Sequence, residues 1–160
     1  VDAAGITKPT LYHYFGSKRG LLEAVLTPPF TQFNQQVRAA AVYSGDLPLT
    51  LKRVAEAVFS FARENPGFYR LQLALWFAPR DSEGYQVVSS LNRQAHDILE
   101  ALFAQAVQQH GNMRGRQTTY AATFLGMLNT YAAMALNDYA QLDAALVEQV
   151  VHQFQHGIYS

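Results

Sequence analysis

The chain has 160 residues, 49% hydrophobic and 15% charged, which is enough for one compact domain with a sizeable core plus a small appendage. Its formal net charge is +0, so the total charge argues neither for nor against a nucleic-acid partner. The lack of cysteine excludes disulfides, thiolate metal sites and cysteine nucleophiles, and without a signal-peptide pattern or an apolar run of about 20 residues we expect a soluble cytoplasmic protein.

Hydrophobic periodicity is helical along nearly the whole chain and strand-like alternation never persists, so we expect an all-α protein. The predicted helices cover residues near 8–15, 17–26, 30–42, 48–64, 66–78, 82–110, 115–137 and 142–157. Pro28 and Pro29 are expected to break or kink the path between the second and third helices, because proline has no N–H to donate to a carbonyl one turn back. Asn65, which is followed by a proline, and either Asp81 or Ser82 are expected N-caps.

The first predicted helix lies in the string GITKPTLYHYFGSKRGLL, residues 5–22. A helical wheel places Leu11, Tyr14 and Phe15 together on the side that faces a core. The rest of the helix and the start of the next one present hydroxyl, phenol, imidazole and ammonium groups, which suit phosphate oxygens and base edges. The candidate DNA-binding residues are Thr7, Lys8, Pro9, Thr10, Tyr12, His13 and Lys18.

The stretch AGITKPTLYHYFGSKRGLL resembles the second half of the helix-turn-helix of the TetR (tetracycline repressor) family of bacterial transcription regulators. The resemblance implies that this helix enters the major groove and that the residues named above contact DNA. It also implies a partial DNA-binding domain over residues 1–26 and a larger helical bundle for ligand binding and dimerisation over 27–160. The family's first helix and most of its second are expected to precede Val1. The alternative is a capped helical hairpin whose aromatic residues only fill a core.

The central helices of the family enclose a small-molecule pocket, and this chain is rich in large apolar and aromatic residues between positions 47 and 131. The candidate ligand-binding residues are Tyr69, Trp76, Asn92, His96, Tyr120, Phe124 and Asn129. Low charge in this region favours a hydrophobic or aromatic effector. The alternative for each aromatic residue is ordinary core packing.

The last two predicted helices suggest a dimer interface, because the helix near 115–137 is apolar on more than one side. Two such helices from each protomer would form a four-helix interface in which small residues permit close approach. The candidate interface residues are Ala122, Gly126, Thr130, Ala133, Val147, Val150, Val151 and Phe154. The alternative is a monomer in which both helices are internal.

The sequence gives little indication of metal binding or catalysis. Glu148, His152 and His156 recur every four residues on one helical face, but three ligands in a row fit a tetrahedral metal poorly, so no metal or other cofactor is expected. No nucleophile–base pair, phosphate loop or close carboxylate pair is evident, so no enzymatic activity is expected either. We therefore expect a ligand-responsive regulator, most often a repressor in this family, that binds a palindromic operator as a homodimer and is released by a small molecule. The rival is an all-α small-molecule binding protein without DNA-binding activity.

Overall fold

The computed structural model describes residues 17–159, and no strand occurs among them. The helices are α2 (Lys18–Ala40), α3 (Leu47–Glu64), α4 (Pro66–Trp76), α5 (Glu83–Ala106), α6 (Gln117–Leu136) and α7 (Ala144–His156), with 3₁₀ turns at Gly111–Met113 and Gly157–Tyr159. The expected all-α architecture is confirmed. Within the described residues, no helix is both long and apolar enough to cross a membrane.

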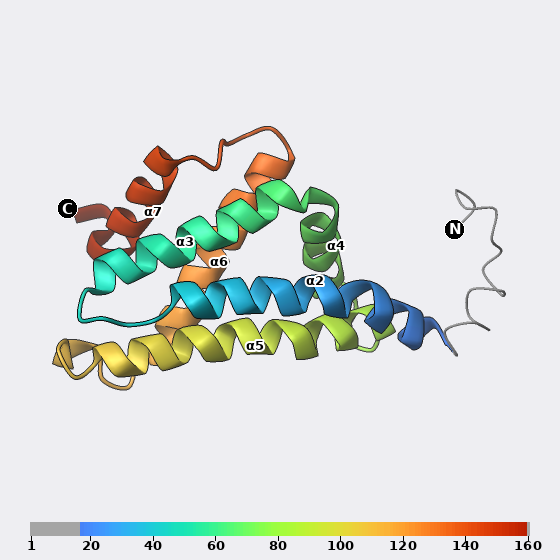
Figure 1. Ribbon diagram of the computed structural model, residues 1–160, viewed down its shortest axis with the longest axis horizontal. Helices are drawn as coiled ribbons and strands as arrows, with labels where there is room; N and C mark the ends of the chain where they lie inside the picture. The colour runs from blue at the N-terminus through green and yellow to red at the C-terminus, as the bar shows by residue number, and fades with distance from the viewer. Residues whose placement is uncertain (1–16, 160) are drawn as a thin grey trace.

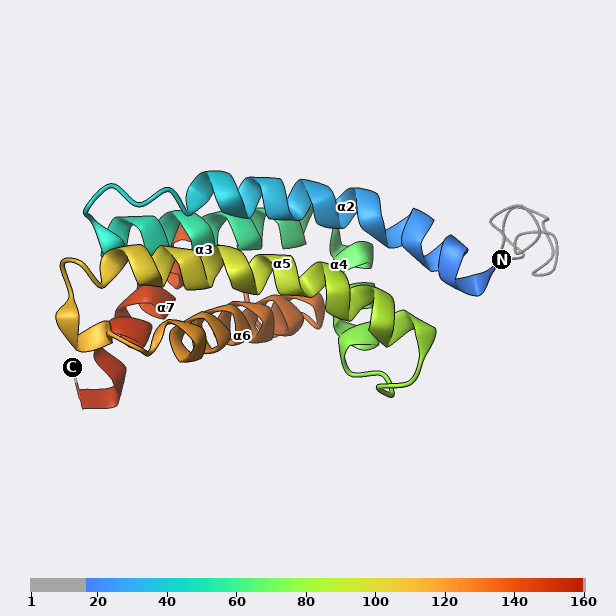
Figure 2. The same cartoon turned by 90° about the horizontal axis from the view of Figure 1, so that it is seen from below.

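The helices form an elongated bundle in which α2 and α5 run side by side along most of the long axis (Figures 1 and 2). The helix α3 packs against α2 and α7, and α6 packs along α5 on the other side of the bundle. The short α4 lies at the end of the bundle nearer the start of α2, whereas α7 lies at the opposite end (Figure 1). The core between these helices is built from apolar side chains, of which the most bulky are Phe30, Phe59, Phe61, Tyr69, Phe103 and Phe124.

The helix α2 is continuous through Pro28 and Pro29, so the segments expected near 17–26 and 30–42 form one helix; of the two predicted outcomes, a break or a kink, the break is wrong. The two prolines leave the carbonyls of Ala24 and Val25 without intrahelical donors. Both of those residues are exposed, so water can bond to the freed carbonyls and the helix continues. Figures 1 and 2 show α2 bending in its N-terminal part, as expected for a proline-containing helix.

Most helix starts follow the local sequence, although α4 and α6 begin without a side-chain cap bond. Ser82 Oγ accepts a hydrogen bond from Tyr85 N–H at 3.2 Å, as a capping residue should. Asn65 makes no side-chain cap bond to α4 and instead donates from Nδ2 to Phe61 O, 3.2 Å away. The predicted role of Asn65 is therefore corrected: its side chain serves the end of α3, and Pro66 alone marks the start of α4.

Candidate DNA-binding and effector sites

The residues predicted to contact DNA fall into two groups. Six of them lie outside the described residues: Thr7, Lys8, Pro9, Thr10, Tyr12 and His13. The seventh, Lys18, is the exposed first residue of α2. Ser17 caps this end of the helix, since its Oγ accepts a hydrogen bond from Gly20 N–H at 3.0 Å. A lysine at the positive end of a helix dipole is well placed to bind a phosphate group.

A small interior cavity lies among α2, α4, α5 and α6. Its volume is about 10 Å³, which is space for about one water molecule. The lining consists of four apolar side chains and four neutral polar ones: Phe30, Phe33, Phe68, Tyr69, Gln72, Asn92, Leu125 and Asn129. The aromatic rings pack edge to face, with the centroids of Phe30 and Phe68 separated by 5.0 Å and their planes at 88°. We call this space the central cavity.

Three of the seven predicted ligand-binding residues, Tyr69, Asn92 and Asn129, meet at the central cavity. The hydroxyl of Tyr69, a residue only 1% exposed, donates a hydrogen bond to Asn129 Oδ1. Burial raises the pKa of the Tyr69 hydroxyl, so this group keeps its proton and remains a donor. Asn92 is 7% exposed and lies on α5.

Sequence reasoning missed most of the cavity wall. Gln72 is 5% exposed and lies three residues after Tyr69, on the same face of α4. A single polar residue within the apolar stretch 71–77 was a usable signal for it. Phe30 and Phe33 gave no comparable signal, because an apolar side chain at helical spacing reads the same whether it lines a cavity or fills a core.

An open groove of about 560 Å³ runs between α4 and α6. It is lined by Arg70, Leu73, Ala74, Trp76, Phe77, Gly126, Asn129, Thr130, Ala133, Leu136 and Asn137. Trp76, predicted as a ligand-binding residue, stacks on Tyr85 with ring centroids 5.6 Å apart. The guanidinium of Arg70 donates to Leu136 O at 2.6 Å and to Asn137 Oδ1 at 3.2 Å, so the one charged side chain in this lining is engaged at the end of α6. We call this space the α4–α6 groove.

The remaining predicted ligand-binding residues lie elsewhere. Phe124 is fully buried and packs on Phe154, with ring centroids 4.9 Å apart. Tyr120 lies 5.7 Å from Phe103 in the same aromatic cluster. His96 is half-buried on α5 and is part of neither the cavity lining nor the groove lining. The structure therefore does not bring these three residues together with Tyr69.

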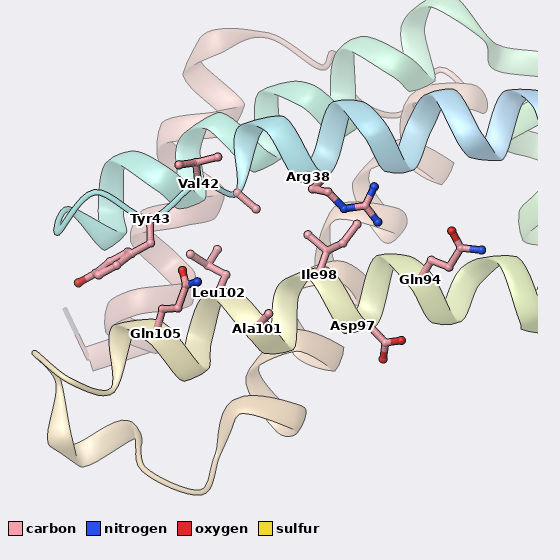
Figure 3. A pocket seen from close by; sticks show the side chains of 10 residues that line it. Arg38, Val42, Tyr43, Gln94, Asp97, Ile98, Ala101, Leu102 and Gln105 are labelled. Carbon is pink, nitrogen blue, oxygen red and sulfur yellow. The ribbon is translucent and has the colours of Figure 1, made fainter.

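A second open groove, of about 540 Å³, lies on the outside of the bundle between α2 and α5 (Figure 3). The charged side chains of Arg38 and Asp97 lie toward one end of it, and Val42 and Leu102 toward the other. None of its lining residues also lines the central cavity or the α4–α6 groove. It is therefore a separate surface feature with charged walls.

The predicted dimer residues on α6 and α7 have different surroundings. On α6, three are exposed and one is half-buried: Ala122, Gly126, Thr130 and Ala133. On α7, three are buried in the protomer core and one is half-buried: Val147, Val150, Val151 and Phe154. The apolar stripe of α7 packs against α3 and α6 of the same protomer, so its valines have little surface left to offer a partner.

The histidine face of α7 does not form a metal cluster. Glu148 pairs with Lys52 of α3, with Oε2 and Nζ 2.8 Å apart. The rings of His152 and His156 lie side by side with centroids 4.6 Å apart. In the part of the chain that the structure describes, no group of three or more potential ligands could hold a metal ion.

Comparison with protein families places the N-terminal segment. Residues 1–25 match the family model described as "Bacterial regulatory proteins, tetR family". The match confirms the resemblance of residues 4–22 and extends into α2. No curated protein matches the chain.

Proposed function

Because residues 1–25 match a family of bacterial regulatory proteins, we propose that this chain is a transcription regulator of the TetR family that binds a palindromic operator as a homodimer in the cytoplasm, represses transcription, and is released by a small-molecule effector. The family assignment concerns the N-terminal 25 residues. The effector response and the dimer are argued from the described helices, as follows.

The observation that carries the proposed effector response is the continuity of α2. The segment matched to the DNA-binding family ends at residue 25, inside this helix. Phe30 and Phe33 of the same helix line the central cavity. A displacement at the cavity wall can therefore reach the DNA-binding segment through one helix, without an intervening flexible linker.

An effector can act only if it binds two states with different affinity. In the present state the central cavity has space for about one water molecule, so a larger compound fits only after the wall has moved. Such a compound would favour the moved state. If that state holds the two DNA-binding segments of a dimer at a spacing that no longer matches successive major grooves, the operator is released.

The outward face of α6 supports the proposed dimer. The helix carries no charged residue, yet Gly126 and Thr130 are exposed. The Thr130 hydroxyl donates to Gly126 O at 3.0 Å, so its hydrogen bond is made within the helix. A helix face that is uncharged, has small side chains and has its exposed hydroxyl hydrogen-bonded within the helix suits close contact with a second copy. A partner there would also form the outer wall of the α4–α6 groove, which Gly126 and Thr130 help to line.

A mobility-shift assay with the full-length protein and the DNA upstream of its own gene tests the proposal. Regulator binding should be sequence-selective and should weaken steeply as salt rises, because counterions are released from phosphates. Lys18→Ala should weaken binding and reduce the salt slope by about 1. Lys52→Ala, which removes a lysine on α3 paired with Glu148, is the matched control and should leave binding unchanged. Absence of any shift at low salt would refute the regulator proposal and favour the rival, a small-molecule binding protein.

A further inference from the structure

The hydrogen bond between Tyr69 and Asn129 lies between the central cavity and the α4–α6 groove. Asn129 lines both spaces, whereas Tyr69 lines only the cavity. The Tyr69 hydroxyl donates to Asn129 Oδ1 and so ties α4 to α6 at the boundary. The bond therefore lies at the boundary that the groove and the cavity share.

Two amide side chains at the cavity lack hydrogen-bond partners. Gln72 is 5% exposed and Asn92 is 7% exposed, and neither has a hydrogen-bond partner among the described residues 17–159. Among the described residues, the one enclosed side-chain polar atom without a partner is Asn34 Oδ1, so the amide atoms of Gln72 and Asn92 keep some contact with solvent. A bound molecule that accepts from and donates to these amides can take the place of that water, whereas one without polar atoms would enclose them unpaired, which is unfavourable.

The charges of the lining select against an ionised ligand. No charged side chain lines the central cavity. In the α4–α6 groove the guanidinium of Arg70 is already bonded to Leu136 O and to Asn137 Oδ1. An ionised group moved into this interior would lose its hydration without gaining a counter-charge, which is strongly unfavourable.

The aromatic rings of the cavity wall favour an aromatic ligand. Phe33 and Tyr69 meet edge to face with centroids 6.1 Å apart, and Phe30 contacts Phe68 in the same manner. An inserted ring can replace these mutual contacts by similar contacts to itself, since edge-to-face arrangements between rings are favourable.

We propose that the Tyr69–Asn129 hydrogen bond is a gate through which an uncharged aromatic compound with both a hydrogen-bond donor and an acceptor passes from the α4–α6 groove into the central cavity. Inside, the compound bonds to Gln72 and Asn92 and separates Phe30 and Phe33 of α2. This inference rests on the proposed function, because it identifies the chemical class and entry route of the effector.

The ligand class is tested by isothermal titration calorimetry of the full-length protein with 2-naphthamide and 2-naphthoate at pH 7.5. The two probes share the ring system, but only the amide is uncharged and able to donate and accept. We expect saturable binding of 2-naphthamide with a Kd at least about ten-fold lower than that of 2-naphthoate. Equal or tighter binding of the carboxylate, or no saturable binding of the amide, would overturn the inference.

The site is tested with Gln72→Leu and Asn92→Leu, which remove an amide at similar volume. Each should weaken 2-naphthamide binding about ten-fold, the effect of losing one good hydrogen bond. Gln105→Leu, in the groove of Figure 3, is the matched control and should bind the probe as the original protein does. Unchanged affinity in a folded Gln72→Leu or Asn92→Leu protein would place the probe elsewhere and overturn the site.

The gate is tested by stopped-flow kinetics with Tyr69→Phe, which keeps the ring and removes the donor. The association rate of 2-naphthamide should rise several-fold, because the bond that ties α4 to α6 is gone. Tyr43→Phe removes an exposed hydroxyl bonded to Gln109 and should leave the rate unchanged. An unaltered rate in Tyr69→Phe would overturn the gate, and this variant remains informative if a leucine variant fails to fold.

These measurements need no DNA, so failure of the gate and failure of the proposed function can be told apart. Probe binding with the expected selectivity but no operator shift would sink the regulator proposal and leave the site standing. An operator shift together with a preference for 2-naphthoate would overturn the inference about the effector and leave the regulator proposal standing.

Discussion

Asn34 is a buried polar residue of α2 in the interior of the bundle. It is 2% exposed, and its Nδ2 donates to Gln94 Oε1 at 3.4 Å and to Leu91 O at 3.5 Å. Its Oδ1 is buried without a hydrogen-bond partner. Two acceptor oxygens already face this side chain. A negative charge at this buried position would therefore have no donor to stabilise it, which is unfavourable.

Asn34→Asp should therefore destabilise the fold strongly at neutral pH. It replaces a donor by a carboxylate that faces two oxygen acceptors, and we expect the free energy of unfolding to fall by about 3 kcal/mol at pH 7. Burial should raise the pKa of the introduced carboxyl above its unfolded value of about 3.9, so the loss should shrink as the pH falls toward that value. Urea unfolding at several pH values measures this, with the exposed Asn112→Asp as control. Equal losses in the two variants would contradict the burial argument.

His96 gives the fold a defined response to acid. Partial burial lowers the pKa of its imidazole and Arg93 adds to this, whereas Glu100 and Asp97 act in the opposite direction. Above pH of about 6.5 the imidazole is neutral in both the folded and the unfolded chain. Below that pH the unfolded chain takes up the proton first, so the free energy of unfolding decreases until the folded imidazole is protonated as well.

His96→Gln should reduce the loss of stability between pH 7 and pH 5. Thermal unfolding followed by circular dichroism at each pH measures the change in midpoint. His110→Gln removes an exposed imidazole and is the matched control. If the two variants changed the acid response by the same amount, the lowered pKa of His96 would not be its cause.

At the level of the helices, capping side chains at the N-terminal ends fix where several of them begin. Asp46 Oδ1 accepts from Leu49 N–H at 2.9 Å, and Asp143 Oδ1 accepts from Leu146 N–H at the same distance. Each satisfies a donor that has no partner inside the helix. Asn65 looks like a cap in the sequence but makes no such bond.

The two residues Asp46 and Asn65 should therefore respond differently to alanine. Asp46→Ala should lower the free energy of unfolding by about 1 kcal/mol, because it leaves Leu49 N–H without its acceptor. Asn65→Ala removes only the 3.2 Å bond to Phe61 O, whose backbone oxygen also accepts from Asn65 N–H, so its effect should be smaller. Urea denaturation compares the two. A larger loss for Asn65→Ala would reverse the assignment of their roles.

At the scale of the whole molecule, α6 presents a face that the protomer does not cover. A Cβ added at Gly126 would meet no atom within 4 Å, so this position has room for a side chain in the protomer. Gly67 on α4 is also exposed and equally open, which makes it a comparable site away from α6.

Gly126→Arg should separate the proposed dimer without unfolding the single chain. A charged, bulky side chain cannot be accommodated where two helix faces approach closely, whereas replacing glycine within a helix does not destabilise the helix itself. Analytical ultracentrifugation should show a monomer for Gly126→Arg and a dimer for Gly67→Arg. A dimeric Gly126→Arg protein would exclude this face of α6 as the interface.

The helices could be predicted closely because their signals are local. The expected segments near 48–64 and 66–78 correspond to Leu47–Glu64 and Pro66–Trp76, and Ser82 was one of the two predicted caps of the next helix. Only part of the candidate site could be predicted. Tyr69 and Tyr120 are both tyrosines in predicted helices, yet the first lines the central cavity and the second belongs to an aromatic cluster around Phe154.

The sequence alone determined the helical class, most helix ends and the match of residues 1–25 to a family of regulatory proteins, because periodicity, caps and an N-terminal motif each depend on residues within a few turns of one another. The tertiary structure decided which side chains meet. It carried α2 through two prolines whose freed carbonyls face solvent, and it turned the valines of α7 into the protomer's own core. It also placed Asn129 between the groove and the cavity. These outcomes depend on contacts between residues far apart in the chain, and an apolar or amide side chain reads the same in sequence whichever neighbour it will meet.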